Sequence, residues 1–223
     1  MSSLDVYAFK YYSKFILLSA AEKGVFTMPE IKWVGMKDAD AAFPEQSLPY
    51  GAKPLRTPDP FSAATLPYGL LPLLLCFGAL FFKAWLLGRF PMEPGYIPLG
   101  ILLGLLLIPV HEYLHGVCYP KGSTVYVGLI PKKMAAFAVC HVPISWRRFM
   151  VMSLLPAILG LVPLLAFLFA PASWGKIMGV CWPLAVMGLL SPMPDYMCVA
   201  CVRRQVPRGA WLQTTNSGCF WYM

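Results

Sequence analysis

The sequence predicts a mainly helical, polytopic membrane protein with about four transmembrane helices and a β-hairpin between the second and the third. Of its 223 residues, 58% are hydrophobic and only 13% are charged, which is too apolar for an ordinary soluble domain. Four apolar stretches are each long enough to cross about 30 Å of hydrocarbon as a helix. Between the second and third stretches lie two β-prone runs that are too short to cross as helices.

The four transmembrane helices are expected at about residues 61–87, 99–117, 149–170 and 176–200. The first is rich in Leu and Phe, and Lys83 near its end has a stem long enough to reach the membrane surface. Pro109 lies inside the second helix, and the sequence Ser191-Pro192-Met193-Pro194 interrupts the fourth. Proline breaks helical hydrogen bonding, which membrane proteins tolerate where the loosened backbone meets protein or water.

The β-prone runs at 124–130 and 134–142 flank Pro131-Lys132-Lys133 and predict a hairpin over residues 123–143. This hairpin directly follows the second transmembrane helix. It could offer a strand edge to an extended peptide, or it could be a simple surface hairpin. Both interpretations remain open at this stage.

The segments outside the spans differ in composition from the membrane-embedded domain, residues 61–202. Residues 1–60 hold seven of the ten acidic residues and six prolines, so we expect an irregular segment in water or at the membrane interface. Within it, Phe15–Ala21 is expected to be a short membrane-surface helix or a loose arm. Residues 203–223 are expected to form a basic tail on the membrane interface.

The distribution of basic residues predicts the orientation. The amino-terminal segment, the hairpin region and the tail hold seven, five and three Lys or Arg, whereas the opposite side has only Arg89 and Lys176. The positive-inside rule therefore predicts a multi-pass protein of the cell membrane with both termini toward the cytoplasm. The net charge of +8 lies in loops between apolar stretches, so anionic headgroups are the expected partner and nucleic acid is not.

The most informative motif is His111-Glu112-Tyr113-Leu114-His115, late in the second transmembrane helix. Positions i and i+4 of a helix share a face, so the two imidazoles can bind one metal ion. Glu112 points elsewhere and is free to take a proton from a metal-activated water. Ionisable groups at membrane depth are costly and are usually kept for a site, although a packed polar cluster is the alternative. The motif predicts Zn²⁺.

A catalytic zinc usually has three protein ligands, so one more is needed. Asp195 is the candidate, because the predicted orientation places it at the same depth as His111 and His115, near the cytoplasmic boundary. The alternative for Asp195 is a helix-end cap or an ion pair with an arginine. His141 is a possible alternative ligand or substrate-site residue. With this set, Glu112 is the expected catalytic base of peptide-bond hydrolysis.

These residues together resemble a known family. The chain is similar to the bacterial putative zincin membrane peptidases, formerly a domain of unknown function. The similarity lies in His111-Glu112-x-x-His115-Gly116, in a following hairpin that ends in Cys140-His141, and in Pro194-Asp195 late in the fourth helix. The resemblance runs from about Pro67 to the carboxyl end and implies a peptidase. The chain is more distantly similar to site-2 intramembrane zinc proteases, in which a glycine follows the third ligand. Tyr196 stands at that position here.

Two other classes of function compete with a membrane zinc metallopeptidase that cleaves membrane-anchored substrates. One is a scaffold or assembly factor that binds zinc only for folding. Structural zinc sites tend to have four protein ligands and no need for Glu112, which disfavours it. The other is a metal or proton transporter, which is disfavoured because no second polar relay crosses the outer half of the membrane.

Overall fold

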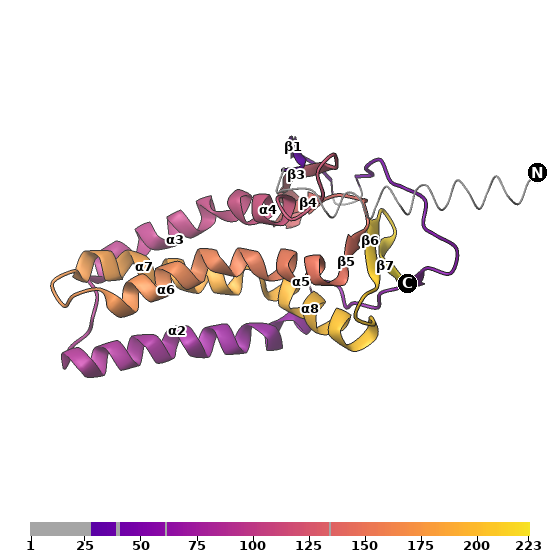
Figure 1. Cartoon of the computed structure of the whole chain (residues 1–223). Coiled ribbons are helices and arrows are strands. Elements are labelled where there is room, and N and C mark those ends of the chain that lie inside the picture. Colours follow the sequence, from indigo (N-terminus) through magenta and orange to yellow (C-terminus); the bar gives the residue numbers. More distant parts are fainter. Residues whose placement is uncertain (1–27, 39–40, 61, 134) are drawn as a thin grey trace, which may run out of the picture.

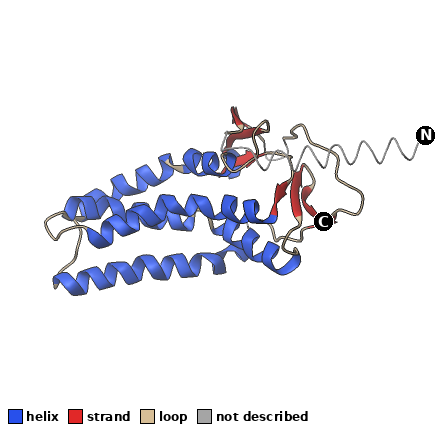
Figure 2. Cartoon of the chain, in the orientation of Figure 1, coloured by secondary structure: helices blue, strands red, loops and turns tan. Residues whose placement is uncertain are grey.

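The computed structural model describes residues 28–38, 41–60, 62–133 and 135–223. It is a mainly helical bundle with two small sheets at one end (Figure 1 and Figure 2). Four helical stretches are long and apolar enough to cross a membrane, namely 63–87, 94–116, 146–169 and 175–205. They confirm the number and approximate positions of the predicted spans, as helices of membrane length. The helix or arm expected at Phe15–Ala21 lies outside the described residues.

Three of the four stretches are interrupted. The helices are α2 (Leu66–Leu87), α3 (Ile97–Leu106), α4 (Ile108–Gly116), α5 (Trp146–Leu154), α6 (Ile158–Phe169), α7 (Gly175–Leu190) and α8 (Met193–Gln205), with 3-10 turns at Ala63–Thr65, Pro94–Tyr96, Pro131–Lys133 and Leu155–Ala157. The interruptions in the second and fourth stretches were expected from their prolines. The 3-10 turn that separates α5 from α6 was not. It contains Pro156, which has no N–H to continue the helical ladder.

Helix α7 lies at the centre of the bundle, because it packs against α2, α3 and α6. Glycines allow the close approach to α6. A Cβ atom at Gly160 would meet the backbone of Gly188 and Leu189, and one at Gly188 would meet the backbone of Gly160. Small residues of this kind let helix backbones touch, as in membrane helix pairs. The carboxyl end of α7, from which α8 starts, is therefore held firmly in the bundle.

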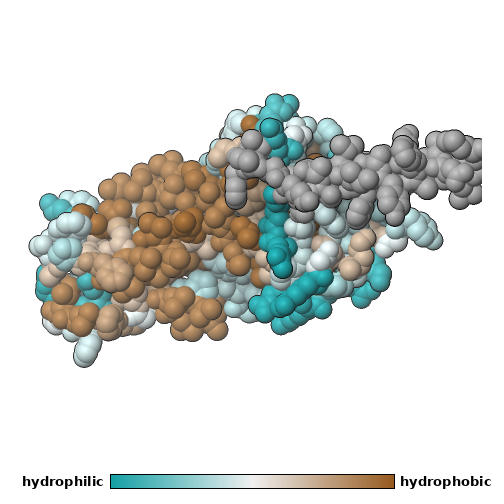
Figure 3. All heavy atoms as spheres, in the orientation of Figure 1, coloured by the Kyte–Doolittle hydropathy of each residue, from teal (hydrophilic) through white to brown (hydrophobic). Residues whose placement is uncertain are grey.

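The helical part of the molecule presents an apolar surface. Figure 3 shows hydrophobic residues over the helices and hydrophilic residues gathered where the helices meet the sheets. In the most apolar window of each stretch, only 11% to 33% of the residues are buried inside the protein. Exposed apolar surface of this extent is unusual for a protein in water and is compatible with contact to lipid.

The first sheet contains the predicted hairpin. Strand β3 (Thr124–Ile130) pairs antiparallel with β4 (Ala135–Val139) through the turn Pro131–Lys133, which confirms the hairpin. Strand β1 (Glu30–Met36) pairs in parallel with β3, so the strand order is β1-β3-β4. The interpretation of residues 1–60 as wholly irregular was wrong for this strand.

The second sheet joins the carboxyl-terminal tail to two distant segments. Its strands, in the order β2-β7-β6-β5, are β2 (Lys53–Pro54), β7 (Gly218–Tyr222), β6 (Trp211–Thr215) and β5 (Ile144–Ser145), all antiparallel. The sequence did not indicate these strands. The tail is thus a folded hairpin that follows α8.

Residues 43–57 reach from Phe43, which stacks on Tyr126 of the first sheet, to strand β2 of the second sheet. Side-chain amides hold this segment. Asn216 accepts from the Phe43 N–H and donates to its carbonyl, at 3.0 Å and 2.9 Å. Gln205 makes the same pair of bonds with the backbone of Arg56, at 3.0 Å and 2.7 Å. Two-sided amide contacts replace the strand partners that an extended backbone otherwise needs. The segment forms part of the folded unit, beside the candidate site.

Candidate metal centre

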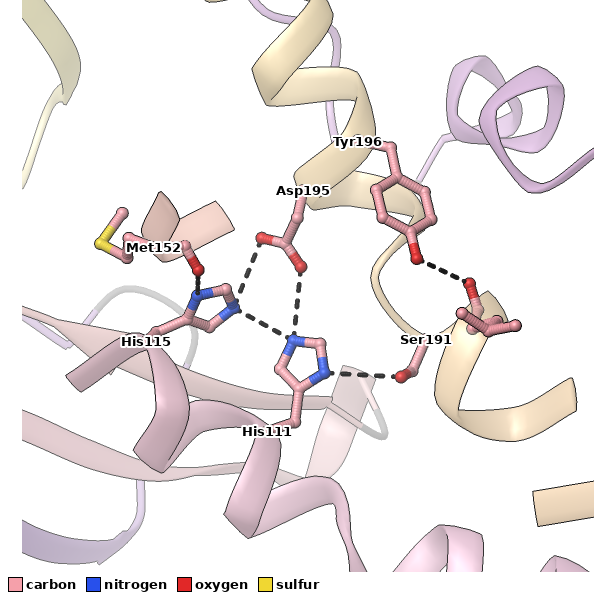
Figure 4. A network of polar contacts seen from close by, with 7 residues as sticks. His111, His115, Met152, Ser191, Asp195 and Tyr196 are labelled. Atoms are coloured by element: carbon pink, nitrogen blue, oxygen red, sulfur yellow. Dashed lines mark hydrogen bonds and ion pairs between the residues drawn. The ribbon is translucent and has the colours of Figure 1, made fainter. Parts of the chain in front are cut away.

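The two histidines of the motif face the same space. Helix α4 begins after the interruption at Leu107, and His111 and His115 stand one turn apart on it. Their Nε2 atoms are 3.1 Å apart, and the rings meet edge to face (Figure 4). The predicted helical geometry of the motif is therefore present.

Asp195 reaches this pair from the other end of the chain. It lies in the first turn of α8, and its two carboxylate oxygens face the two imidazoles, at 3.3 Å from His111 Nε2 and 3.4 Å from His115 Nε2. Among the described residues, these three side chains form the group of His, Cys, Asp and Glu whose ligand atoms could share one ion. The structure thus brings together three residues that the sequence analysis had placed at the same depth in the membrane.

The donor atoms fit a zinc ion in spacing and in type. Two ligands of a tetrahedral zinc, each about 2.0–2.1 Å from the ion, are separated by about 3.3 Å. The three separations of 3.1, 3.3 and 3.4 Å match that edge. The side chains of His111, His115 and Asp195 are 10%, 11% and 23% exposed, so the carboxylate is the most accessible of the three.

The other ring nitrogen of each histidine also has a neighbour. His115 Nδ1 lies 3.0 Å from the Met152 carbonyl, which can only accept, so Nδ1 carries the proton and Nε2 keeps its lone pair for the cluster. Residue 156, four positions after Met152, is a proline, so the helix offers this carbonyl no N–H donor. His111 Nδ1 lies 3.4 Å from Ser191 Oγ. Such outer partners orient metal-binding histidines.

Glu112 and the three candidate ligands line one cavity of about 610 Å³. One wall is β4, from Ala135 to Ala138, and another includes Leu55 and Thr57 of the extended segment. On the side of the bundle, the lining includes an apolar recess formed by Gly104, Leu107, Ile108, Leu159, Leu184 and Gly188. The cavity therefore joins a strand edge, a carboxylate and an apolar recess at one place.

Two ionisable groups on the sheet side of the cavity are uncharged near neutral pH. Burial raises the pKa of Tyr119 far above its ordinary value and raises the pKa of the Cys219 thiol to about 11. A neutral thiol is a poor nucleophile and a poor metal ligand. These groups therefore do not compete with Glu112 or with the histidines for chemistry in the cavity.

His141 lies elsewhere. It follows β4, its ring is buried, and Nδ1 is 3.0 Å from the Pro44 carbonyl, to which it can only donate. The structure does not place it in the group formed by His111, His115 and Asp195. Through this hydrogen bond, His141 holds the extended segment against the first sheet.

Sequence reasoning did not identify several residues around the cavity. Ser191 was noted only as part of a broken helix, and Met152 contributes through its carbonyl, which has no side-chain signature. The spacing of Met152 and Pro156 was the available signal, since a proline four residues later frees a carbonyl. Leu55 and Thr57 could not have been found, because their position depends on pairing with the distant strand β7.

The fold is thus mainly helical, with four stretches long and apolar enough to cross a membrane and a His-His-Asp cluster that forms a candidate metal centre. Residues 104–211, which include all three cluster residues, match the family described as "Putative zincin peptidase". The family resemblance drawn from the motifs is thereby confirmed. Neither the curated proteins nor the solved structures gave a significant match.

Proposed function

We propose that the protein is a zinc metallopeptidase embedded in the cell membrane, which hydrolyses peptide bonds of membrane-anchored substrates. The observation that carries this proposal is the meeting of Asp195 with His111 and His115, in a cavity that Glu112 also lines. The family match supports a metallopeptidase, and the name zincin implies zinc.

His111, His115 and Asp195 would hold the ion, which when bound supplies a Lewis acid for activating water and polarising a carbonyl. Glu112 is the general base that accepts the proton of the attacking water and then delivers it to the leaving amine. The Met152 carbonyl keeps His115 in the tautomer that presents Nε2. Water can reach the cavity beside Thr57 and Pro60, which line it and are exposed.

The cavity suits an extended peptide. Strand β4 is the outer strand of its sheet, and residues 135–138 line the cavity, so a substrate can pair with β4 and pass the candidate ligands. The apolar recess around Leu107 and Leu184 then accepts an apolar side chain next to the scissile bond. A membrane-anchored segment, once unwound, supplies both features.

The orientation follows from charge. The two sheets and the carboxyl end of the chain lie at one end of the bundle, where hydrophilic residues gather (Figure 1 and Figure 3). Most Lys and Arg residues belong to segments at that end, so we assign it to the cytoplasm, in contact with anionic headgroups. Substrates are then cut near the cytoplasmic boundary of the membrane.

The experiment is to compare the wild type with Glu112→Gln after reconstitution in bilayers with zinc and a mixed-sequence library of lipid-anchored peptides. We expect the wild type to produce new peptide ends, read by mass spectrometry, and Glu112→Gln to bind zinc but produce none. Glu93→Gln, a carboxylate at the opposite end of the bundle, is the matched control and should cleave normally. Equal cleavage by Glu112→Gln contradicts the assigned base, and zinc binding without cleavage by the wild type favours a scaffold.

A further inference from the structure

Tyr196 forms a contact that the proposed chemistry does not explain. Its hydroxyl donates to the Leu189 carbonyl at 3.1 Å, across the interruption between α7 and α8 (Figure 4). Pro192 and Pro194 have no N–H, so they cannot pair with the carbonyls four residues before them as a continuous helix would. The backbone on both sides of Leu189 is thus weakened, and a side-chain hydroxyl ties the two helices together at this point.

Asp195 and Tyr196 are adjacent in the first turn of α8 but point in different directions. Successive residues of a helix are about 100° apart around its axis, because a turn has 3.6 residues. Asp195 points to the imidazoles on α4, and Tyr196 points back to the end of α7 (Figure 4). The first turn of α8 is therefore held at two points, one on each neighbouring helix.

The same junction contacts the histidine pair from a second side. Ser191, at the end of α7, lies 3.4 Å from His111 Nδ1. A shift of the junction would consequently move both the carboxylate of Asp195 and the neighbour of His111. Two of the three candidate ligands depend on how α8 leaves α7.

A small rotation of α8 is enough to disturb the cluster. Side-chain tips lie roughly 5–6 Å from a helix axis, so a rotation of about 10° moves a tip by about 1 Å. The carboxylate oxygens now lie 3.3 Å and 3.4 Å from the two Nε2 atoms, the spacing that a shared zinc ion requires. A displacement of about 1 Å would take at least one oxygen out of that spacing.

We propose that Tyr196 is a positioning residue that sets the rotation of α8 through its bond to the Leu189 carbonyl, and thereby aims Asp195 at the histidine pair. The inference rests on the proposed metal centre and adds to it.

The test uses Tyr196→Phe, which keeps the ring and removes only the hydroxyl. Zinc affinity is measured by competition with a chelator on the purified protein in detergent, and the cobalt-substituted protein is examined by its visible absorption, which reports ligand geometry. We expect zinc affinity to fall roughly 10- to 100-fold, the range found when an outer-shell partner is lost, and the cobalt spectrum to change. Tyr113→Phe is the matched control, since the Tyr113 hydroxyl faces Met28 Sδ at 3.8 Å, outside the cluster.

The outcomes separate this inference from the proposed function. Unchanged zinc affinity and cobalt spectrum in Tyr196→Phe, with a wild type that binds zinc, overturn the inference alone. A wild type that binds neither ion removes the metal centre itself. Thermal unfolding of the metal-free proteins gives the last comparison. A fall in affinity accompanied by an equal loss of metal-free stability assigns Tyr196 to packing and overturns the inference, whereas a fall with stability unchanged supports it.

Discussion

Replacing Asp195 by Asn should empty the metal centre and leave the bundle folded. The substitution keeps the shape of the side chain but removes the charge that faces His111 Nε2 and His115 Nε2 at 3.3 Å and 3.4 Å. Structural zinc sites bind with about 10–16 kcal/mol, which is about 3–4 kcal/mol for each of their ligands. Loss of one ligand of this strength corresponds to a zinc affinity roughly 10²- to 10³-fold lower.

The assay is zinc content after dialysis against a weak chelator, followed by affinity from chelator competition, for the wild type and three variants. Asp195→Asn should lose the ion, while Glu93→Gln should keep it. Glu93 belongs to the connection between α2 and α3, which lies at the end of the bundle away from the sheets (Figure 1). His141→Ala should also keep the ion, since that ring is bonded to the Pro44 carbonyl. The reasoning is refuted if Asp195→Asn retains zinc at wild-type affinity, and retention there combined with loss in His141→Ala makes His141 the third ligand.

Two further predictions concern the cavity and the far end of the bundle. Leu184→Trp should fill the apolar recess and lower the cleavage rate about tenfold or more, with zinc affinity unchanged. The control is Leu165→Trp, on an exposed face of α6, which should cleave at the wild-type rate. Equal cleavage rates for the two variants would place the substrate elsewhere. Lys83→Met should lose two charge-assisted bonds to the carbonyls of Leu168 and Ala170, now 2.8 Å and 2.7 Å long. At about 1.5–3 kcal/mol each, their loss should destabilise the fold by about 3–6 kcal/mol, read as a lower thermal midpoint with zinc affinity unchanged.

The sequence predicted the parts of this protein that depend on local chemistry. The length of the apolar runs predicted the four membrane-length helical stretches. The spacing of His111 and His115 predicted that both imidazoles lie on one face of α4. The meeting of Asp195 with that pair was also predicted, although about 80 residues separate them along the chain. The prediction worked because the apolar stretches were treated as spans of similar length, so that the depth of each residue could be counted along its span.

The strands that were missed depend on distant partners. Glu30 of β1 pairs with Thr124 of β3, and Lys53 of β2 pairs with Trp221 of β7. Strand preference is decided largely by the neighbours a segment packs against, which a local pattern does not contain. The extended segment 43–57 is harder still to predict. The side-chain amides of Asn216 and Gln205 make hydrogen bonds to its backbone, and both residues lie far from it in the sequence.

The interruptions of the helices show why the site forms where it does. Pro72, Pro163 and Pro183 lie inside continuous helices, so proline alone does not break a span here.

The three spans that contribute to the cluster are all interrupted near it, and each interruption has a consequence. The first sets α4 apart as the short helix that carries both imidazoles, the second leaves the Met152 carbonyl free for His115, and the third starts α8 so that its first turn delivers Asp195. A straight helix would use its own carbonyls and keep its direction. The breaks in this chain thus supply both the free carbonyl that His115 contacts and the change of direction that brings Asp195 to the histidines.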